Sequence, residues 1–246
     1  MRTWVIDLDG VMWRGNLPID GSAEAIARIR AGGDRVLFAT NHSAPTRLDH
    51  LDALRRMGVG CDEEDLFTSA DAAASLVRAG ETAHVLADRG VREALTRRRV
   101  NITDGSKADV VIVGWHEAFT FARLTSAVRT VLGGARLVAT NDDRLRPGPQ
   151  GPVPGCGALV AYVEAATSTE AARAGKPYQP MADLLLPRLS GSTTVVGDSG
   201  ATDGGLAVRL GARFAWVGSG VDKHAAAGRP EIVGSDLLDV VVQEQT

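Results

Sequence analysis

The chain has 246 residues, of which 44% are hydrophobic and 23% are charged, and its formal net charge is −3. This composition excludes a disordered chain, and the near-neutral charge argues against nucleic acid as a partner. No apolar run reaches the roughly 18 residues that a membrane span needs. Two acids directly follow Met1–Ile6, so we expect no signal peptide. Two cysteines are too few for a disulfide scaffold. We therefore expect a soluble cytoplasmic protein that binds neither nucleic acid nor membrane.

Short apolar runs alternate with helical stretches along the chain. The runs end in polar or glycine-containing turns, as is typical of strands buried on both faces of a parallel sheet. This alternation predicts an α/β fold. In chain order, the predicted strands are Trp4–Ile6, Arg35–Ala39, Asp109–Gly114, Arg136–Thr140, Thr193–Val196 and Phe214–Val217.

After the second run, Ser43 and Pro45 are typical of a helix start. Apolar residues then recur at spacings of three, and we expect this stripe to pack into the core as one face of a crossover helix. A further helix is predicted over Ala158–Ala166. The middle of the chain has strands and a helix of its own, which predicts a second domain inserted at residues 80–173 between core segments 1–79 and 174–246. The apolar stripe predicted after Pro45 consists of Leu48, Leu51, Leu54 and Met57.

The strongest chemical signal is Asp7-Leu8-Asp9-Gly10, directly after the first predicted strand. Residues at i and i+2 of an extended chain point to the same side, and the carboxyl ends of parallel strands face the crevice where α/β proteins bind ligands. Two carboxylates held close together repel each other, and a divalent cation such as Mg²⁺ removes that conflict. A solvated turn is the alternative interpretation of this segment alone.

Two further segments place polar groups beside predicted strand or helix ends. Thr40 and Asn41 end the second predicted strand before a helix, where a hydroxyl and an amide can donate to an anion. Lys176 is one of only three lysines and lies between Gly175 and Pro177. Its compact charge is suited to neutralising a phosphoryl oxygen, although an ordinary surface lysine has the same local sequence.

A third segment, Val195-Val196-Gly197-Asp198, ends another predicted strand. Asp198 is a candidate to complete a metal site. Asp203 follows five residues later, and three roles are open to it. It can support the metal site, orient Lys176, or begin the helix over 206–210, where an acid is favourable.

Together, these acids, the threonine and the lysine resemble the haloacid dehalogenase superfamily of aspartate-nucleophile phosphohydrolases. Asp7 with Asp9 matches the first motif of that superfamily, Thr40 the second, Lys176 the third, and Asp198 with Asp203 the fourth. The resemblance implies a Rossmann-like core. The inserted segment resembles the C2-type α/β cap of subfamily IIA, the nitrophenylphosphatase-like and nucleotide-phosphatase-like members. The cap resemblance is also supported by Val113–Phe121, Ala139–Asp143 and Pro154–Gly157.

The resemblance implies a Mg²⁺-dependent phosphatase that acts on a small soluble phosphate monoester. Asp7 would attack phosphorus and form an aspartyl phosphate. Asp9 would protonate the leaving oxygen and later deprotonate water. Mg²⁺ would bind Asp7, the backbone carbonyl of Asp9, and Asp198. Thr40, Asn41 and Lys176 would hold the transferring oxygens. Caps of this type often pair, so a homodimer is expected by analogy.

The sequence departs from the subfamily pattern at two histidines. His42 stands where members usually have Asn, and His116 stands where they tend to have Asp. Trp115 and His116 are the candidates for contact with the leaving group, since the cap closes over the core site in this family. A histidine whose charge switches near neutral pH is compatible with a substrate that carries a second anionic group.

Two other functions remain open at this point. A phosphotransferase or mutase of the same superfamily would pass the aspartyl phosphate to a sugar. A phospho-acceptor signalling module also combines acids, a threonine and a lysine around Mg²⁺, but such modules are about half this length and carry the phosphorylated aspartate after a later strand. Sugar phosphates, nucleoside monophosphates, glycerol phosphate and phosphoglycolate are all compatible substrates.

Overall fold

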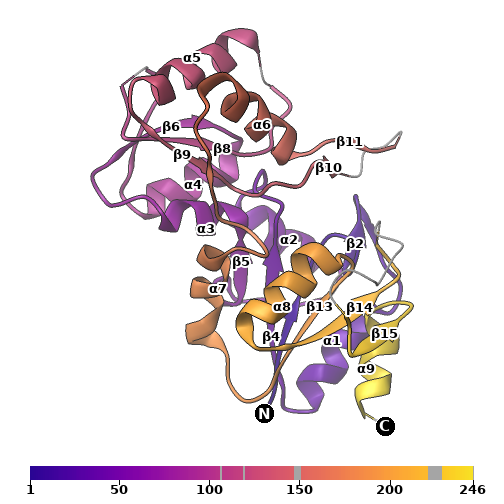
Figure 1. The fold of residues 1–246 in the computed structure, drawn as a ribbon. Helices are drawn as coiled ribbons and strands as arrows, with labels where there is room; N and C mark the ends of the chain where they lie inside the picture. The colour runs from indigo at the N-terminus through magenta and orange to yellow at the C-terminus, as the bar shows by residue number, and fades with distance from the viewer. Residues whose placement is uncertain (106, 119, 147–150, 221–228, 246) are drawn as a thin grey trace. The chain divides into compact units, whose positions relative to one another are not determined.

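A computed structural model describes residues 1–105, 107–118, 120–146, 151–220 and 229–245 (Figure 1). The chain divides into two compact units. Unit 1 comprises residues 1–40, 48–67 and 176–246, and unit 2 comprises 41–47 and 68–175. Within the described residues, no helix has the length and apolar character needed to cross a bilayer. Each unit contains its own mainly parallel sheet with helices packed on it, so the predicted α/β class and Rossmann-like core are confirmed.

The sheet of unit 1 has six strands. In spatial order they are β15 (Ile232–Gly234), β14 (Arg213–Val217), β13 (Thr193–Gly197), β1 (Thr3–Ile6), β4 (Arg35–Thr40) and β5 (Leu66–Thr68). β1 lies between β13 and β4 and is parallel to both. β4, the strand of this sheet that follows β1 along the chain, therefore lies on one side of β1, and β13, which comes much later in the chain, lies on the other. This reversal of strand order is where open α/β sheets bind ligands, at the carboxyl ends of the strands.

The helices of unit 1 bury the apolar side chains of both sheet faces. On one face, the core includes Trp4, Ile6, Phe38 and residues of helices α1, α2 and α9, and α1 contacts α9 (Figure 1). Helix α8 packs on β13 and β14 and also contacts α7. The helices are α1 (Ser22–Ala31), α2 (Arg47–Arg56), α7 (Gln179–Leu185), α8 (Gly205–Leu210) and α9 (Leu237–Gln245).

The predicted stripe of helix α2 is partly wrong. Leu51 and Leu54 are buried in the core and Met57 packs against it, but Leu48 is 57% exposed. The helix begins at Arg47 rather than directly after Ser43, so Leu48 lies in its first turn. The face of the helix that carries Leu48 points to solvent, because residues spaced three apart move progressively around a helix of 3.6 residues per turn.

Unit 2 has a five-stranded parallel sheet, and the described residues of its segment 68–175 form four helices. In spatial order the strands are β12 (Ala172–Arg173), β9 (Arg136–Ala139), β8 (Val110–Val113), β6 (Thr82–Leu86) and β7 (Asn101–Thr103). The helices are α3 (Ser69–Ser75), α4 (Arg89–Arg97), α5 (Phe121–Leu132) and α6 (Cys156–Thr167), and apolar residues of α5 and α6 share a core with β8 and β9.

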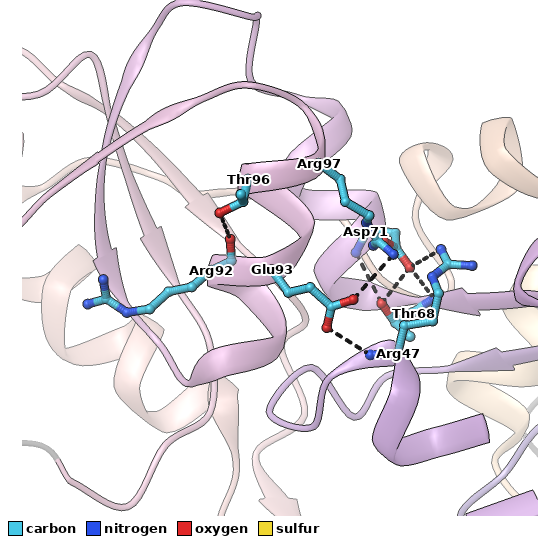
Figure 2. A network of polar contacts seen from close by, with 7 residues as sticks. All are labelled: Arg47, Thr68, Asp71, Arg92, Glu93, Thr96 and Arg97. Atoms are coloured by element: carbon cyan, nitrogen blue, oxygen red, sulfur yellow. Dashed lines mark hydrogen bonds and ion pairs between the residues drawn. The ribbon is translucent and has the colours of Figure 1, made fainter. Parts of the chain in front are cut away.

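A polar network joins the 41–47 segment to helices α3 and α4 of unit 2 (Figure 2). Asp71 accepts hydrogen bonds from Arg47 at 2.8 Å and from Arg97. The same carboxylate forms a capping box with Thr68 at the start of α3, and Glu93 accepts a hydrogen bond from the backbone N–H of Arg47 at 3.1 Å. These contacts fix residues 41–47 to unit 2, although helix α2, which begins at Arg47, belongs to unit 1 from Leu48 onward.

Candidate active site

Three neighbouring strands of unit 1 end in buried polar side chains. Asp7 follows β1, Thr40 ends β4, and Asp198 follows β13. Their exposed fractions are only 8%, 1% and 6%. The strands are parallel, so their carboxyl ends lie at one edge of the sheet. The predicted Asp7, Thr40 and Asp198 therefore lie at the same edge.

Lys176 lies among the carboxylates. Its Nζ donates to Oδ1 of Asp7 at 2.6 Å and to Oδ1 of Asp203 at 2.7 Å, and all three side chains are buried. Asp203 lies in a single π-helical turn, η3 (Gly200–Gly204), ahead of α8. Its Oδ2 accepts the backbone N–H of Ser199 at 3.1 Å. Of the three roles open to Asp203 in the sequence, the geometry favours the orientation of Lys176.

The buried charges strongly perturb one another. Burial raises the pKa of Asp7 well above its ordinary value, and Asp203 and Asp198 add to the rise while Lys176 opposes it. Burial alone would lower the pKa of Lys176, but Asp203 and Asp7 outweigh it and raise that pKa. Lys176 is therefore cationic, and it lies in a buried cluster of three acidic side chains.

The residues present fit a divalent cation. Asp7, Asp198 and Asp203 offer carboxylate oxygens that all lie within 4.8 Å of one another. A second positive charge would favour the anionic form of Asp7, and hard oxygen ligands are those that Mg²⁺ prefers. The Asp198 carboxylate itself packs against two glycines, because a Cβ on Gly10 would lie 2.6 Å from its Oδ2 and one on Gly220 only 1.8 Å from it.

Asp9 lies in the turn that follows β1 and is partly exposed. Its Oδ1 accepts the indole N–H of Trp13 at 3.1 Å. A second indole, that of Trp216, donates to the backbone carbonyl of Asp198 at 2.8 Å. Sequence reasoning missed both tryptophans. The available signal for Trp13 was a hydrogen-bonding aromatic residue four positions after an acid in a turn, whereas nothing local marks Trp216.

Asn41, which was predicted beside Thr40, belongs to unit 2. Its backbone carbonyl accepts hydrogen bonds from Ser69 Oγ at 2.7 Å and Asn141 Nδ2 at 2.8 Å. Its own side-chain amide donates to Asp143 at 3.3 Å. The division between the units therefore falls between Thr40 and Asn41.

Trp115 and His116 follow β8 in unit 2 and line a cavity of about 450 Å³. The Arg146 guanidinium lies 3.7 Å from the ring centroid of Trp115, a contact that sequence reasoning also missed. His116 is buried, and its Nδ1 lies 3.1 Å from the Gly114 carbonyl. Burial lowers the pKa of His116, so it is neutral at pH 7. The lowered pKa argues against a charge switch of His116 near neutral pH, and Arg89, Arg123 and Arg146 line the same cavity.

Two family models match the chain. One, described as haloacid dehalogenase-like hydrolase, covers residues 4–100, and one described as HAD-hydrolase-like covers residues 173–240. An acid sugar phosphatase of Staphylococcus saprophyticus is 31% identical over 208 residues, which is 82% of this chain and 80% of that protein. The 5'-nucleotidase YutF of Bacillus subtilis is 28% identical over 229 residues, 91% of this chain and 89% of that protein.

Solved structures of phosphatases are also similar to this chain over nearly its whole length. A p-nitrophenyl phosphatase from Archaeoglobus fulgidus matches with a TM-score of 0.91 at 27% identity over 98% of both chains. A glycerol phosphate phosphatase from Mycobacterium tuberculosis, solved in complex with magnesium, matches with a TM-score of 0.88 at 26% identity, over 97% of this chain and 76% of that one.

Proposed function

This chain belongs to the haloacid dehalogenase-like hydrolases, and from that premise we propose that it is a Mg²⁺-dependent phosphatase of small phosphate monoesters that reacts through an aspartyl phosphate. One observation carries the proposal. A buried lysine binds Asp7 at the end of β1, with the carboxylates of Asp198 and Asp203 nearby. Phosphoryl transfer needs this combination of a positioned nucleophile and concentrated charge neutralisation.

Asp7 is the proposed nucleophile. One of its oxygens forms a bond to phosphorus as the bond to the leaving oxygen breaks. Lys176 neutralises charge on the phosphoryl oxygens, and Asp203 holds Lys176 in place. Thr40 and Asn41 are proposed to donate to the same oxygens, from the end of β4 and from the residue that follows it.

Asp9 is the proposed general acid and base. It gives a proton to the leaving oxygen in the first step and takes one from the water that hydrolyses the aspartyl phosphate in the second. Its partial exposure is consistent with proton exchange. A phosphatase that carries such an acid can expel poor, alkoxide leaving groups as well as phenols.

Asp7, Asp198 and the backbone carbonyl of Asp9 would hold Mg²⁺. The bound ion supplies charge neutralisation between the anionic nucleophile and the anionic phosphate. The magnesium complex of the Mycobacterium tuberculosis relative supports the choice of metal. Since Asp203 is already bound to Lys176 and to Ser199, we assign it to positioning rather than to the metal.

The proposed substrate class is a phosphate monoester of a small polar alcohol. Relatives named acid sugar phosphatase and glycerol phosphate phosphatase support it. Unit 2 is proposed to be the C2-type cap, with Trp115 and His116 contacting the leaving group. We further propose that the enzyme is cytoplasmic and homodimeric, and that it does not bind nucleic acid or membranes. Light scattering on the purified protein tests the dimer.

The first experiment is hydrolysis of p-nitrophenyl phosphate with Mg²⁺, with EDTA, and with Asp7→Asn beside the wild type. We expect release of p-nitrophenol that needs Mg²⁺ and is absent in the variant, which should retain its fold by circular dichroism. Turnover by Asp7→Asn equal to that of the wild type would contradict the nucleophile assignment.

A second experiment separates hydrolysis from phosphoryl transfer. The wild type is given p-nitrophenyl phosphate with and without a sugar acceptor, and inorganic phosphate and sugar phosphate are both measured. A hydrolase releases one phosphate for each p-nitrophenol whether or not the sugar is present. Phosphate that appears on the sugar instead would identify a phosphotransferase.

A further inference from the structure

The indole N–H of Trp13 donates a hydrogen bond to one carboxylate oxygen of Asp9. Its Nε1 lies 3.1 Å from Oδ1 of Asp9. The Trp13 side chain is 8% exposed and packs in the core of unit 1. A buried aromatic ring has few accessible rotamers, so the direction of its N–H is set by the core rather than by solvent.

The backbone around Trp13 is also fixed. The Leu8 carbonyl accepts the backbone N–H of Met12 at 2.8 Å, and the Trp13 carbonyl accepts the N–H of Gly10 at 2.7 Å. Gly10 has a φ of 88°, in the left-handed region that glycine adopts without strain. Strand β2 (Trp13–Arg14) then pairs with β3 (Leu17–Pro18) in a short antiparallel hairpin. The turn therefore closes back on itself and returns the indole to the acid.

The two oxygens of a carboxylate are chemically equivalent until the surroundings distinguish them. An N–H donor on Oδ1 whose direction is set by the core fixes the orientation of the whole carboxylate group. General acid catalysis depends on this orientation, because the carboxyl group must lie within hydrogen-bond reach of the leaving oxygen. A carboxylate free to rotate would spend part of its time in unproductive orientations.

We propose that Trp13 is a positioning residue for Asp9, and that its indole N–H, through its hydrogen bond to Oδ1, holds the carboxyl group in the orientation that delivers and later accepts the catalytic proton. In the first step the Asp7–phosphorus bond forms, the bond from phosphorus to the leaving oxygen breaks, and the Asp9 proton passes to that oxygen. In the second step water forms its bond to phosphorus, the Asp7–phosphorus bond breaks, and a water proton returns to the Asp9 carboxylate. This inference rests on the proposed general-acid role of Asp9.

The test compares two substrates of nearly the same shape, p-nitrophenyl phosphate and phenyl phosphate. Nitrophenolate leaves readily without a proton, whereas phenol has a pKa of about 10, like the tyrosine side chain, and needs one. In Trp13→Phe we expect kcat/KM for phenyl phosphate to fall about 10- to 100-fold, as is typical when a supporting hydrogen bond is lost. The value for p-nitrophenyl phosphate should change much less.

Trp4→Phe is the matched control. Trp4 is also a buried tryptophan of the same core, and its Nε1 donates to an aspartate, Asp34, at 3.2 Å. Its removal should lower stability without changing the ratio of the two kcat/KM values. Replacement of Trp13 by benzothienylalanine, which keeps the bicyclic shape but has no N–H, repeats the test should Trp13→Phe fail to fold.

Asp9→Asn separates the two hypotheses. If Asp9→Asn lowers kcat/KM for both substrates equally, the general-acid role is wrong. Suppose that Asp9→Asn lowers kcat/KM more for phenyl phosphate than for p-nitrophenyl phosphate. If Trp13→Phe and the benzothienylalanine variant then lower kcat/KM equally for both substrates, or for neither, the assignment of Trp13 is wrong.

Discussion

The Nζ atom of Lys176 lies 2.6 Å from Oδ1 of Asp7, although 169 residues separate them in the chain. The same atom lies 2.7 Å from Oδ1 of Asp203. This arrangement places one buried cation between two buried carboxylates, and the proposed chemistry depends on it.

Replacement of this lysine should cost both stability and activity. In Lys176→Met the carboxylates of Asp7 and Asp203 lose their buried partner, and a broken buried ion pair typically costs about 3–5 kcal/mol. We expect a loss of this size in urea unfolding with EDTA present, together with a fall in kcat of about 100-fold or more.

Asp7→Asn is the control for the stability measurement. It removes one of the crowded carboxylates whose pKa is raised, so it should be at least as stable as the wild type in EDTA while being inactive. A Lys176→Met protein as stable as the wild type would contradict the importance of this pairing.

Gly197 keeps space for Asp203. A Cβ at Gly197 would lie 2.0 Å from Cγ of Asp203, and β13 is held by neighbours on both sides. Gly197→Ala should therefore displace Asp203, release Lys176, and destabilise the fold by about 1–3 kcal/mol. We expect kcat for p-nitrophenyl phosphate to fall about 10-fold or more. Gly60→Ala, where a Cβ meets nothing within 4 Å, should leave kcat unchanged, and equal activities in the two variants would be evidence against this role.

Asp34 should make stability depend on pH in the acid range. Burial alone would raise the pKa of Asp34, but hydrogen bonds from the backbone N–H and guanidinium of Arg2 and from Trp4 lower it. A lowered pKa stabilises the fold above the ordinary aspartate pKa, and this contribution is lost as pH falls through the lowered value. At pH 7, Asp34→Asn should be about 1–3 kcal/mol less stable than the wild type.

The difference in unfolding free energy between the wild type and Asp34→Asn should become smaller as the pH is lowered below the ordinary aspartate pKa. Urea unfolding at a series of pH values measures this. Glu24→Gln is the control, because Glu24 pairs with Arg28 on the exposed face of α1 and should matter by less than about 1 kcal/mol. If this difference in unfolding free energy stays constant with pH, the Asp34 charge does not contribute to stability.

The two cysteine thiols should differ in reactivity. Burial raises the pKa of Cys156 to about 11, so its thiol stays protonated and inaccessible at pH 8, whereas Cys61 is partly exposed. A disulfide-exchange reagent such as DTNB should label one thiol in the native protein and the second only after unfolding. Cys61→Ala should abolish the native-state labelling, and rapid labelling of that variant would show that Cys156 is accessible.

Much of this protein was readable from short segments. Asp7, Thr40 and Asp198 each directly follow or end an apolar run, and the end of a buried parallel strand is a local feature with a known place in the sheet. The α/β class followed from the same runs. The prediction of the fold class was confirmed, because its signal and the strands it describes both extend over only a few residues.

Other features needed the folded chain. The sequence left three roles open for Asp203, and only the folded chain shows its contact with Lys176, 27 residues away. The exposure of Leu48 depended on where helix α2 begins, and the place of Asn41 in unit 2 depended on hydrogen bonds to Ser69 and Asn141.

The sequence alone determined which residue types stand at the strand ends, and hence the fold class and the kind of chemistry. The tertiary structure decided which side chains touch, down to the indole of Trp13 on one oxygen of Asp9. The physical reason is that strand periodicity is encoded by neighbours along the chain. Hydrogen bonds between side chains instead depend on how distant segments pack, and that packing is a property of the whole core.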